Sequence, residues 1–333
     1  MRIGIVTPAP PNSRSGNRIT ALRWAKILRR VGNRVSILQA YQDKYYDLLI
    51  ALHARRSYPS IIKFRRQNPQ AQIIVALTGT DLYRDLRRNH KAQKSLEIAN
   101  RIVVLQPKAI DELRPAWRGK ARVIYQSVEA LPGSASKTKT SKAYLNDRSN
   151  GSFDICVIGH LRAVKDPFRV ALAARSLPFS SRIRILQMGG ALTDAMAARA
   201  RKETRSNPRY EWLGELSRSH VRRILAKSRL NVVPSRIEGG ANVISEAITA
   251  SVPILASRID GNVGILGADY PGLFEAGDTQ QLVELMVRAE TDREYLTELR
   301  ERCQKLAPLF DPTGEERAWA DLISELFLIE VTI

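Results

Sequence analysis

Short apolar runs alternate with longer amphipathic stretches along the chain. In the first 130 residues, short apolar runs such as RIGIVT, RVSIL, DLLIAL and QIIVALTG occur among amphipathic stretches such as TALRWAKILRRVG. The same alternation restarts further on with FDICVIG, RIRILQMGG, RLNVVPS and VPILAS. Strands that alternate with helices indicate a parallel sheet covered on both faces. The sequence therefore predicts an α/β protein with two such units in series.

A polar interruption separates the two units. Residues 132–152, PGSASKTKTSKAYLNDRSNGS, are rich in Ser, Lys, Gly and Asn and have almost nothing to bury, as expected for a linker or a long loop. We therefore expect one Rossmann-like domain over residues 1–131 and a second one over residues 153–310. An amphipathic helix beginning near Thr313 is predicted to pack back on the first domain within residues 311–333.

The net charge of +20 lies almost entirely in the first half of the chain. Residues 1–130 contain 25 Lys and Arg against 8 Asp and Glu, whereas residues 131–333 contain 28 against 25. This asymmetry indicates that the first domain meets an anion: nucleic acid, an acidic membrane surface or a small phosphorylated substrate. A solvated face that only aids solubility is the alternative.

Two of these partner classes lack the sequence features that they need. No recognised nucleic-acid-binding module is visible, and no cluster of Trp or Phe lies on a basic helix face that could dock on lipid. We therefore expect small charged substrates, no nucleic acid and no stable membrane association. The oligomeric state is left open.

The cysteines and the first residues indicate the cellular compartment in which the protein is expected. Cys156 and Cys303 lie far apart, which argues against a disulfide framework or a zinc site. The start MRIGIVTPAPP is too short an apolar run for a signal peptide, and no stretch approaches the roughly 18 apolar residues of a membrane span. A cytoplasmic location is expected.

The P-loop and the G-x-G-x-x-G pattern are absent, so no cofactor is predicted. No D-x-D pair stands at a strand end to bind a metal ion, so we expect an activity that is independent of metal.

The segment SRIEGGANVISEA places Glu238 and Glu246 on either side of a predicted strand-to-helix turn. Gly239 and Gly240 would expose backbone N–H groups at the helix N-terminus, where an anionic or hydroxyl-rich ligand can approach closely. A carboxylate can accept two hydrogen bonds from a vicinal diol, so two carboxylates would suit a sugar joined to a nucleotide. The alternative is an acid that interacts with the helix dipole and a second, solvated glutamate.

EGGANVISEA, together with VPILAS, GNVGIL, YEWLGEL and VIGHLRAVKDP, resembles the E-x7-E glycosyltransferases of the GT-B fold, which use nucleotide sugars. The resemblance implies two Rossmann-like domains facing across a cleft. It also implies that Glu238 binds the donor sugar and Glu246 the ribose, and that the following segment contacts sugar or diphosphate: Gly239, Gly240, Ala241 and Asn242.

The chain departs from that family at two positions. Ser251 stands where the family usually has glycine. His160 stands where the family usually has an arginine, which together with the counterpart of Lys165 holds the leaving diphosphate. The charge on the leaving group could be met by His160 or by the nearby Arg162, and both stay open. Surface charges after a strand are the structural alternative for Arg162 and Lys165.

Further candidates follow the strands of the first half. The loop after RIGIVT leads into a helix that would present N–H groups and a cation to an anion. ALHARRS and ALTGTDLYRDL carry His53, several arginines, hydroxyls and a carboxylate at strand ends, as in a pocket for a small, highly charged acceptor. A buried structural histidine with solvated arginines is the alternative. The predicted donor ligands here are Gly16 and Asn17, and the predicted acceptor ligands are Ser15, Arg18, Arg55, Thr78, Thr80 and Asp81.

TPAPPNSRSGNRITALRWA, ALHARRS, ALTGTDLYRDL and GHLRAVKDP are similar to segments of the selenosugar synthases of selenoneine biosynthesis. These GT-B enzymes join a UDP-N-acetylhexosamine, chiefly UDP-GlcNAc, to the selenium of selenophosphate. The resemblance implies a metal-independent glycosyltransferase with His53, Lys165 and Glu238 as its catalytic residues. A conventional retaining glycosyltransferase acting on a lipid, sugar or other small acceptor is the alternative.

Overall fold

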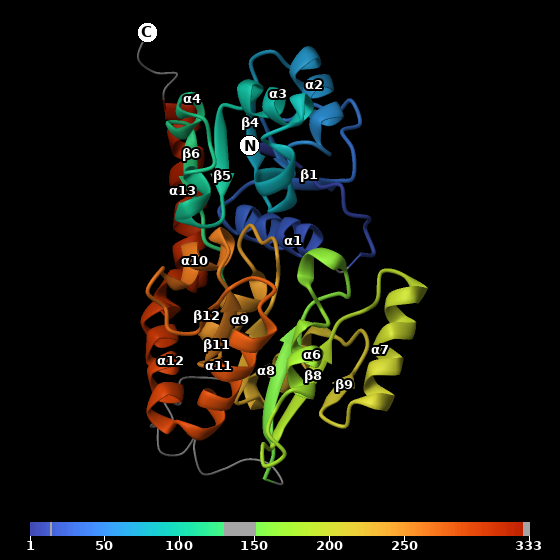
Figure 1. Ribbon diagram of the computed structural model, residues 1–333. Coiled ribbons are helices and arrows are strands. Elements are labelled where there is room, and N and C mark those ends of the chain that lie inside the picture. The colour runs from blue at the N-terminus through green and yellow to red at the C-terminus, as the bar shows by residue number, and fades with distance from the viewer. Residues whose placement is uncertain (14, 130–150, 329–333) are drawn as a thin grey trace. The chain divides into compact units, whose positions relative to one another are not determined.

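The computed structural model describes residues 1–13, 15–129 and 151–328 (Figure 1). Almost all of the linker predicted over residues 132–152 therefore lies outside the described residues. Contacts divide the chain into two compact units. The first unit comprises Met1–Ser127, Ile237–Asn242 and Leu309–Ile333, and the second comprises Val128–Arg236 and Val243–Pro308.

The first unit is built on a six-stranded parallel sheet in the order β2-β1-β3-β4-β5-β6. Its strands are β1 (Arg2–Val6), β2 (Arg34–Leu38), β3 (Leu48–Leu52), β4 (Gln72–Ala76), β5 (Arg101–Val104) and β6 (Ala121–Val123). Its helices are α1 (Gly16–Arg30), α2 (Tyr58–Gln67), α3 (His90–Ile98), α4 (Pro115–Arg118) and α13 (Pro312–Leu328), with short turns η1 (Asp81–Asp85), η2 (Pro107–Ile110) and η4 (Ala307–Phe310).

Both faces of this sheet are buried, which explains why its strands are apolar throughout. Successive residues of a strand point to opposite faces, so Leu49 and Ala51 of β3 pack with α2 and α3, whereas Ile50 and Leu52 pack with α1 and α13. On the second face Trp24 of α1 meets Trp319 of α13 edge to face, with 4.8 Å between ring centroids. The C-terminal helix is thus part of the core of the first unit.

The second unit has its own six-stranded parallel sheet, in the order β12-β11-β10-β7-β8-β9. Its strands are β7 (Phe153–Ile158), β8 (Ile183–Met188), β9 (Tyr210–Trp212), β10 (Leu230–Val233), β11 (Ile254–Ser257) and β12 (Leu273–Phe274). Its helices are α6 (Arg169–Arg175), α7 (Asp194–Ser206), α8 (Arg218–Lys227), α9 (Asn242–Thr249), α10 (Asp260–Leu266), α11 (Thr279–Thr291) and α12 (Arg293–Leu306), with the turn η3 (Ala163–Lys165).

Helix α9 ends in a Schellman motif centred on Ser251. The N–H of Ser251 donates to the carbonyl of Ile248, and the N–H of Val252 donates to the carbonyl of Ala247. This motif needs a left-handed residue, and Ser251 has φ = 56°. A residue with a Cβ is disfavoured in that conformation, which gives a physical reason for the glycine that the resembling family has at this position.

Replacing Ser251 with glycine is therefore expected to stabilise the protein by about 1 kcal/mol, because glycine adopts the left-handed conformation without steric cost. Thermal unfolding should show a rise in Tm of about 2–4 °C. Ser228, which follows α8 in the same unit, has φ = −72° and is the matched control. Ser228→Gly should lower Tm, and an equal response of both variants would contradict the assignment.

Candidate functional site

The strand order of the second unit identifies the edge where a ligand would bind. Strands β7 and β10 are neighbours at the point where the order of the strands reverses, and ligands of open α/β sheets bind beyond the carboxyl ends of the strands at such a point. There the N–H of Arg236, after β10, donates to the carbonyl of Val164, after β7, at 2.8 Å. The loop after β7 carries the predicted diphosphate ligands His160, Arg162 and Lys165.

His160 sits where the ends of β7 and β8 come close together. Its Nδ1 accepts a hydrogen bond from the N–H of Gly190 at 3.2 Å, so in the neutral ring the proton lies on Nε2. Arg162 is exposed, while Lys165 is half-buried at the end of η3. The bond from Gly190 holds the His160 ring in one orientation, whereas the Arg162 side chain extends into solvent.

Glu238 and the two glycines after it belong to the segment Ile237–Asn242, which groups with the first unit. Glu238 is buried, with 8% of its surface exposed. A Cβ on Gly239 would lie 2.5 Å from the carbonyl carbon of Thr78, and a Cβ on Gly240 would lie 2.6 Å from the Cβ of Leu105. Real Cβ atoms do not approach so closely, so both glycines are required by packing, whatever ligand their N–H groups bind.

Asn242 and Glu246 follow on α9. The side-chain oxygen of Asn242, the first residue of the helix, accepts a hydrogen bond from Arg23 at 3.1 Å. Glu246 lies one turn further along and is 3.4 Å from Arg218 of α8. Arg218 is 53% exposed, and exposed ion pairs contribute little, so a ribose could replace this contact at small cost.

In the first unit the strand order reverses at β1 and β3, and the predicted histidine follows β3. His53 is buried with φ = 72°, a left-handed conformation in which histidine is enriched. Its Nδ1 lies 3.4 Å from the N–H of Arg56, and its Nε2 lies 3.3 Å from Oγ1 of Thr80. Burial lowers the pKa of His53, although the nearby carboxylates Asp81 and Asp85 oppose this shift, so the ring is neutral at pH 7.

Asp81 and Arg55 have partners within the first unit. The fully buried carboxylate of Asp81 accepts hydrogen bonds from the N–H groups of Ala54, Thr78 and Gly79 at 2.9–3.0 Å. These bonds join the loops after β3 and β4, so Asp81 is placed to hold the loops that carry the candidate acceptor ligands rather than to meet an acceptor itself. Arg55 is 2.7 Å from Asp85 and is partly exposed.

The loop after β1 leads into α1 as the sequence predicts. The helix begins at Gly16, and the hydroxyl of Ser15 lies 3.1 Å from that of Ser13 instead of capping the helix. Gly16 is exposed, and a Cβ there would meet no atom within 4 Å, so this side of the helix N-terminus is open. Asn17 and Arg18 follow in the first turn and are half-buried.

The sequence analysis missed a buried polar network in the first unit. Glu315 of α13 accepts hydrogen bonds from Nε1 of Trp24 and from the N–H of Ser127, both at 2.8 Å, and its Oε2 lies 3.4 Å from Nε of Arg23. Arg23 in turn bonds Asn242. The available signal was a glutamate in TGEERAW, one turn before the tryptophan that packs into the core.

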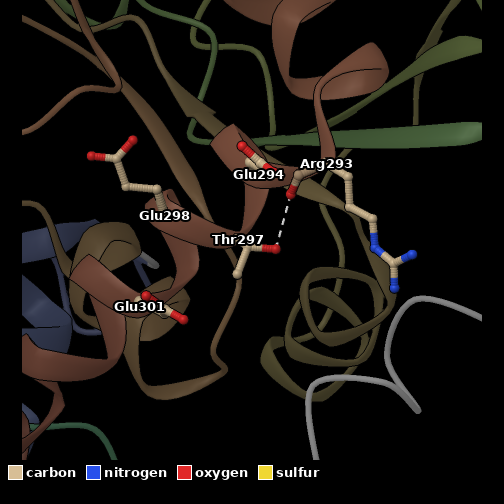
Figure 2. A pocket seen from close by; sticks show the side chains of 5 residues that line it. All are labelled: Arg293, Glu294, Thr297, Glu298 and Glu301. Atoms are coloured by element: carbon tan, nitrogen blue, oxygen red, sulfur yellow. Dashed lines mark hydrogen bonds between the residues drawn. The ribbon is translucent and has the colours of Figure 1, made fainter.

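Other parts of the molecule offer less suitable places for a ligand. A hollow on α12, shown in Figure 2, is lined by the mostly exposed side chains Arg293, Glu294, Thr297, Glu298 and Glu301 of that one helix. The hydroxyl of Thr297 donates to the carbonyl of Arg293 at 2.9 Å, as is common on a helix surface. Because all of its lining residues come from one exposed helix face, the hollow lacks the convergent groups of a substrate site.

The described residues offer neither a metal cluster nor a reactive thiol. Within residues 1–13, 15–129 and 151–328, no group of three His, Cys, Asp or Glu side chains could hold a metal ion. Burial raises the pKa of Cys156 to about 12 and that of Cys303 to about 11, so neither thiol is a ready nucleophile. No helix in the described part of the chain is both long enough and apolar enough to cross a bilayer.

Comparison with known proteins identifies the second unit. The family described as "Glycosyl transferases group 1" matches residues 145–308. The chain is 23% identical over 287 residues to the putative teichuronic acid biosynthesis glycosyltransferase TuaC of Bacillus subtilis, an alignment that covers 84% of this chain and 70% of TuaC. It is 24% identical over 225 residues to glycosyltransferase 1 domain-containing protein 1 of Xenopus tropicalis, covering 65% of each protein. The chain thus spans about two thirds of the length of these relatives.

Solved structures establish the fold. Sucrose-phosphate synthase of Thermosynechococcus elongatus superposes with a TM-score of 0.77 at 15% identity, covering 98% of this chain and 99% of that one. Anabaena HepE in complex with UDP-glucose superposes with a TM-score of 0.73 at 15% identity, covering 98% of this chain and all of that one. The predicted GT-B architecture of two parallel-sheet, Rossmann-like halves is confirmed.

Proposed function

We propose that this chain, whose residues 145–308 match the family described as "Glycosyl transferases group 1", transfers N-acetylhexosamine from a UDP-sugar to the selenium of selenophosphate. UDP-GlcNAc is the donor that we propose first. The observation that carries the donor half of the proposal is the bond between Arg236 N–H and the Val164 carbonyl, which joins the loop of Lys165 to the loop that leads to Glu238. A cation for a diphosphate and a carboxylate for sugar hydroxyls thus arise from neighbouring strand ends.

The donor roles follow from the chemistry of the side chains. Glu238 would accept hydrogen bonds from hydroxyls of the sugar, and Glu246 would accept them from the ribose. Lys165, with His160 or Arg162, would stabilise the negative charge that develops on the departing UDP, a task that needs no metal. UDP and UDP-glucose bound to Anabaena HepE support a uridine diphosphate donor for a protein of this fold.

The acceptor roles rest on the charge and the strand ends of the first unit. The first 130 residues contain 25 Lys and Arg against 8 Asp and Glu. Arg55, His53 and Thr80 lie at neighbouring strand ends, on loops that the backbone bonds to Asp81 join. Ser15 directly precedes α1 and Arg18 lies in its first turn, in the loop region that follows β1, where the strand order reverses. Cations and hydroxyl groups in these positions fit a small trianion better than a neutral acceptor.

The proposed reaction has two balanced steps. The selenium of selenophosphate donates an electron pair to C1 of the sugar as the bond from C1 to the diphosphate breaks and UDP leaves with that bonding pair. Water then cleaves the Se–P bond, which gives inorganic phosphate and a 1-selenosugar selenol. Selenium is a strong nucleophile, so positioning and charge stabilisation contribute more than a base, and neutral His53 would orient the acceptor.

The test is to incubate the purified protein anaerobically with UDP-GlcNAc and selenophosphate and to follow UDP, phosphate and selenosugar by mass spectrometry. Equal amounts of all three are expected, both with EDTA and without it. Thiophosphate and inorganic phosphate serve as acceptor controls. UDP formation that needs a carbohydrate acceptor instead of selenophosphate would overturn the acceptor assignment.

A conventional glycosyltransferase acting on a carbohydrate or lipid-linked acceptor is the second candidate. The likeness to TuaC favours it, because that relative is described as a teichuronic acid biosynthesis glycosyltransferase. The same incubation separates the two candidates when selenophosphate is replaced by a panel of sugar and polyprenyl-linked acceptors.

A further inference from the structure

A carboxylate directly after Lys165 joins three loops of the second unit. Oδ2 of Asp166 accepts hydrogen bonds from Nε and Nη2 of Arg169 at 3.1 and 3.0 Å, and it lies 3.3 Å from Nε of Arg236. Arg169 also donates through Nη1 to the hydroxyl of Thr279 at 2.6 Å. The loops after β7, β10 and β12 are therefore linked around one side chain that is only 16% exposed.

The backbone of Asp166 is held in an uncommon conformation. Its φ is 43°, in the left-handed region, where a residue other than glycine is strained unless its surroundings fix it. Its N–H donates to the carbonyl of Ala163, and its carbonyl accepts from the N–H of Arg169. This bend comes immediately after Lys165, so the backbone that carries Lys165 ends in a turn that the contacts of Asp166 hold.

Charge explains why a carboxylate suits this position. The guanidinium groups of Arg169 and Arg236 both lie near Gly277, because a Cβ there would be 3.9 and 3.6 Å from their Nη2 atoms. Two cations this close repel each other unless an anion lies between them. Without the Asp166 carboxylate, the loop of Lys165 and the loop that starts at Arg236 would lose the ion pair between Asp166 and Arg236 and keep the bond from Arg236 N–H to Val164.

We propose that Asp166 is a positioning residue for the donor diphosphate: it holds Lys165 in place and ties the Lys165 loop to the loop that leads to Glu238. This proposal rests on the proposed function. It assigns to Asp166 no contact with the substrate. Its effect on binding must therefore pass through Lys165.

The test is a double-mutant cycle with UDP alone as the probe, measured by calorimetry on the full chain. Asp166→Asn is expected to weaken UDP binding on the order of tenfold in the wild-type protein and less than twofold in a Lys165→Met background, because coupled residues are not additive. In the transfer assay the same substitution should raise KM for the UDP-sugar by a similar factor and change kcat less.

Two further variants separate positioning from general damage. Asp166→Gly adopts the left-handed backbone without strain but removes the whole side chain, so it should bind UDP as weakly as Asp166→Asn while Tm stays near the wild-type value, because the relief of strain offsets the lost ion pairs. Asp154 is the matched control, since its carboxylate is also 16% exposed and is held by one arginine, Arg184, but it lies near the opposite end of β7. Asp154→Asn should leave UDP binding unchanged.

The outcomes distinguish this inference from the proposed function. Equal losses from Asp166→Asn with and without Lys165 would overturn the positioning role, as would full binding by Asp166→Gly. If the wild-type protein binds no UDP, the donor assignment itself falls. If it binds UDP but does not use selenophosphate, the acceptor assignment fails and the role of Asp166 is unaffected.

Discussion

Glu238→Gln is expected to lower kcat/KM for sugar transfer from UDP-GlcNAc by about 10²–10³-fold. The carboxylate would accept two hydrogen bonds from donor hydroxyls, and a hydrogen bond to a charged group contributes about 1.5–3 kcal/mol, or roughly tenfold or more each. The amide keeps the shape but loses the charge and one acceptor. UDP release in the presence of selenophosphate measures the effect, and thermal unfolding shows whether the variant is folded.

A buried glutamate outside the candidate site provides the control for this substitution. The side chain of Glu290 on α11 is 6% exposed, and it accepts hydrogen bonds from the hydroxyl of Ser181 at 2.7 Å and the N–H of Arg182 at 2.6 Å. Glu290→Gln should lower Tm and leave kcat/KM within about twofold of wild type, since it removes a structural contact only. Glu238→Gln with more than a third of wild-type activity would rule out the donor role of Glu238.

Gly189→Ala is expected to have the largest effect on stability, about 3–5 kcal/mol. Gly189 has φ = 142°, and a Cβ there would lie 2.0 Å from the carbonyl oxygen of Gly159. The clash is with backbone, not with a flexible side chain. Hydrogen bonds fix both backbones, since Gly159 N–H donates to the carbonyl of Met188 and Gly189 N–H donates to the carbonyl of Gly214. The ends of β7 and β8 would have to separate. Thermal unfolding should show a fall in Tm of about 10 °C.

Gly119→Ala is the matched control for Gly189→Ala. Gly119 has φ = −62°, and a Cβ there would meet no atom within 4 Å. Alanine should therefore change the Tm by only a degree or two in either direction. A similar loss of stability in both variants would mean that the close approach of β7 and β8 is not what requires glycine at position 189.

Individual strands and helices could be predicted from the sequence, because each depends on the pattern of apolar residues within its own segment. Apolar runs such as LLIAL and QIIVA predict strands buried on both faces, and β3 and β4 have that burial. The helix after EGG is α9, which begins at Asn242, and the C-terminal helix predicted from about Thr313 is α13. Strand order is different, because it depends on which crossover follows each strand, and no local pattern contains that information.

The candidate site could be anticipated only in part. Strand-end placement of His53, Lys165 and Glu238 follows from the pattern of the chain, although their roles as ligands stay predictions. Two features depend on contacts between segments far apart in sequence: the need for glycine at position 239, and the burial of Asp81. A sequence gives the residue types at both places but not the backbone that approaches them.

The position of α13 has a consequence for synthesis on the ribosome. Trp319, Leu322, Ile323 and Leu326 complete the face of the sheet formed by β1 and β3, yet they follow every residue of the second unit. The strands made first therefore wait with the part of this face that α1 does not cover still open while the second unit is translated, at about 5–20 residues per second. The first unit therefore completes its core only after the second unit has been made, and until then that part of the face is an exposed apolar surface.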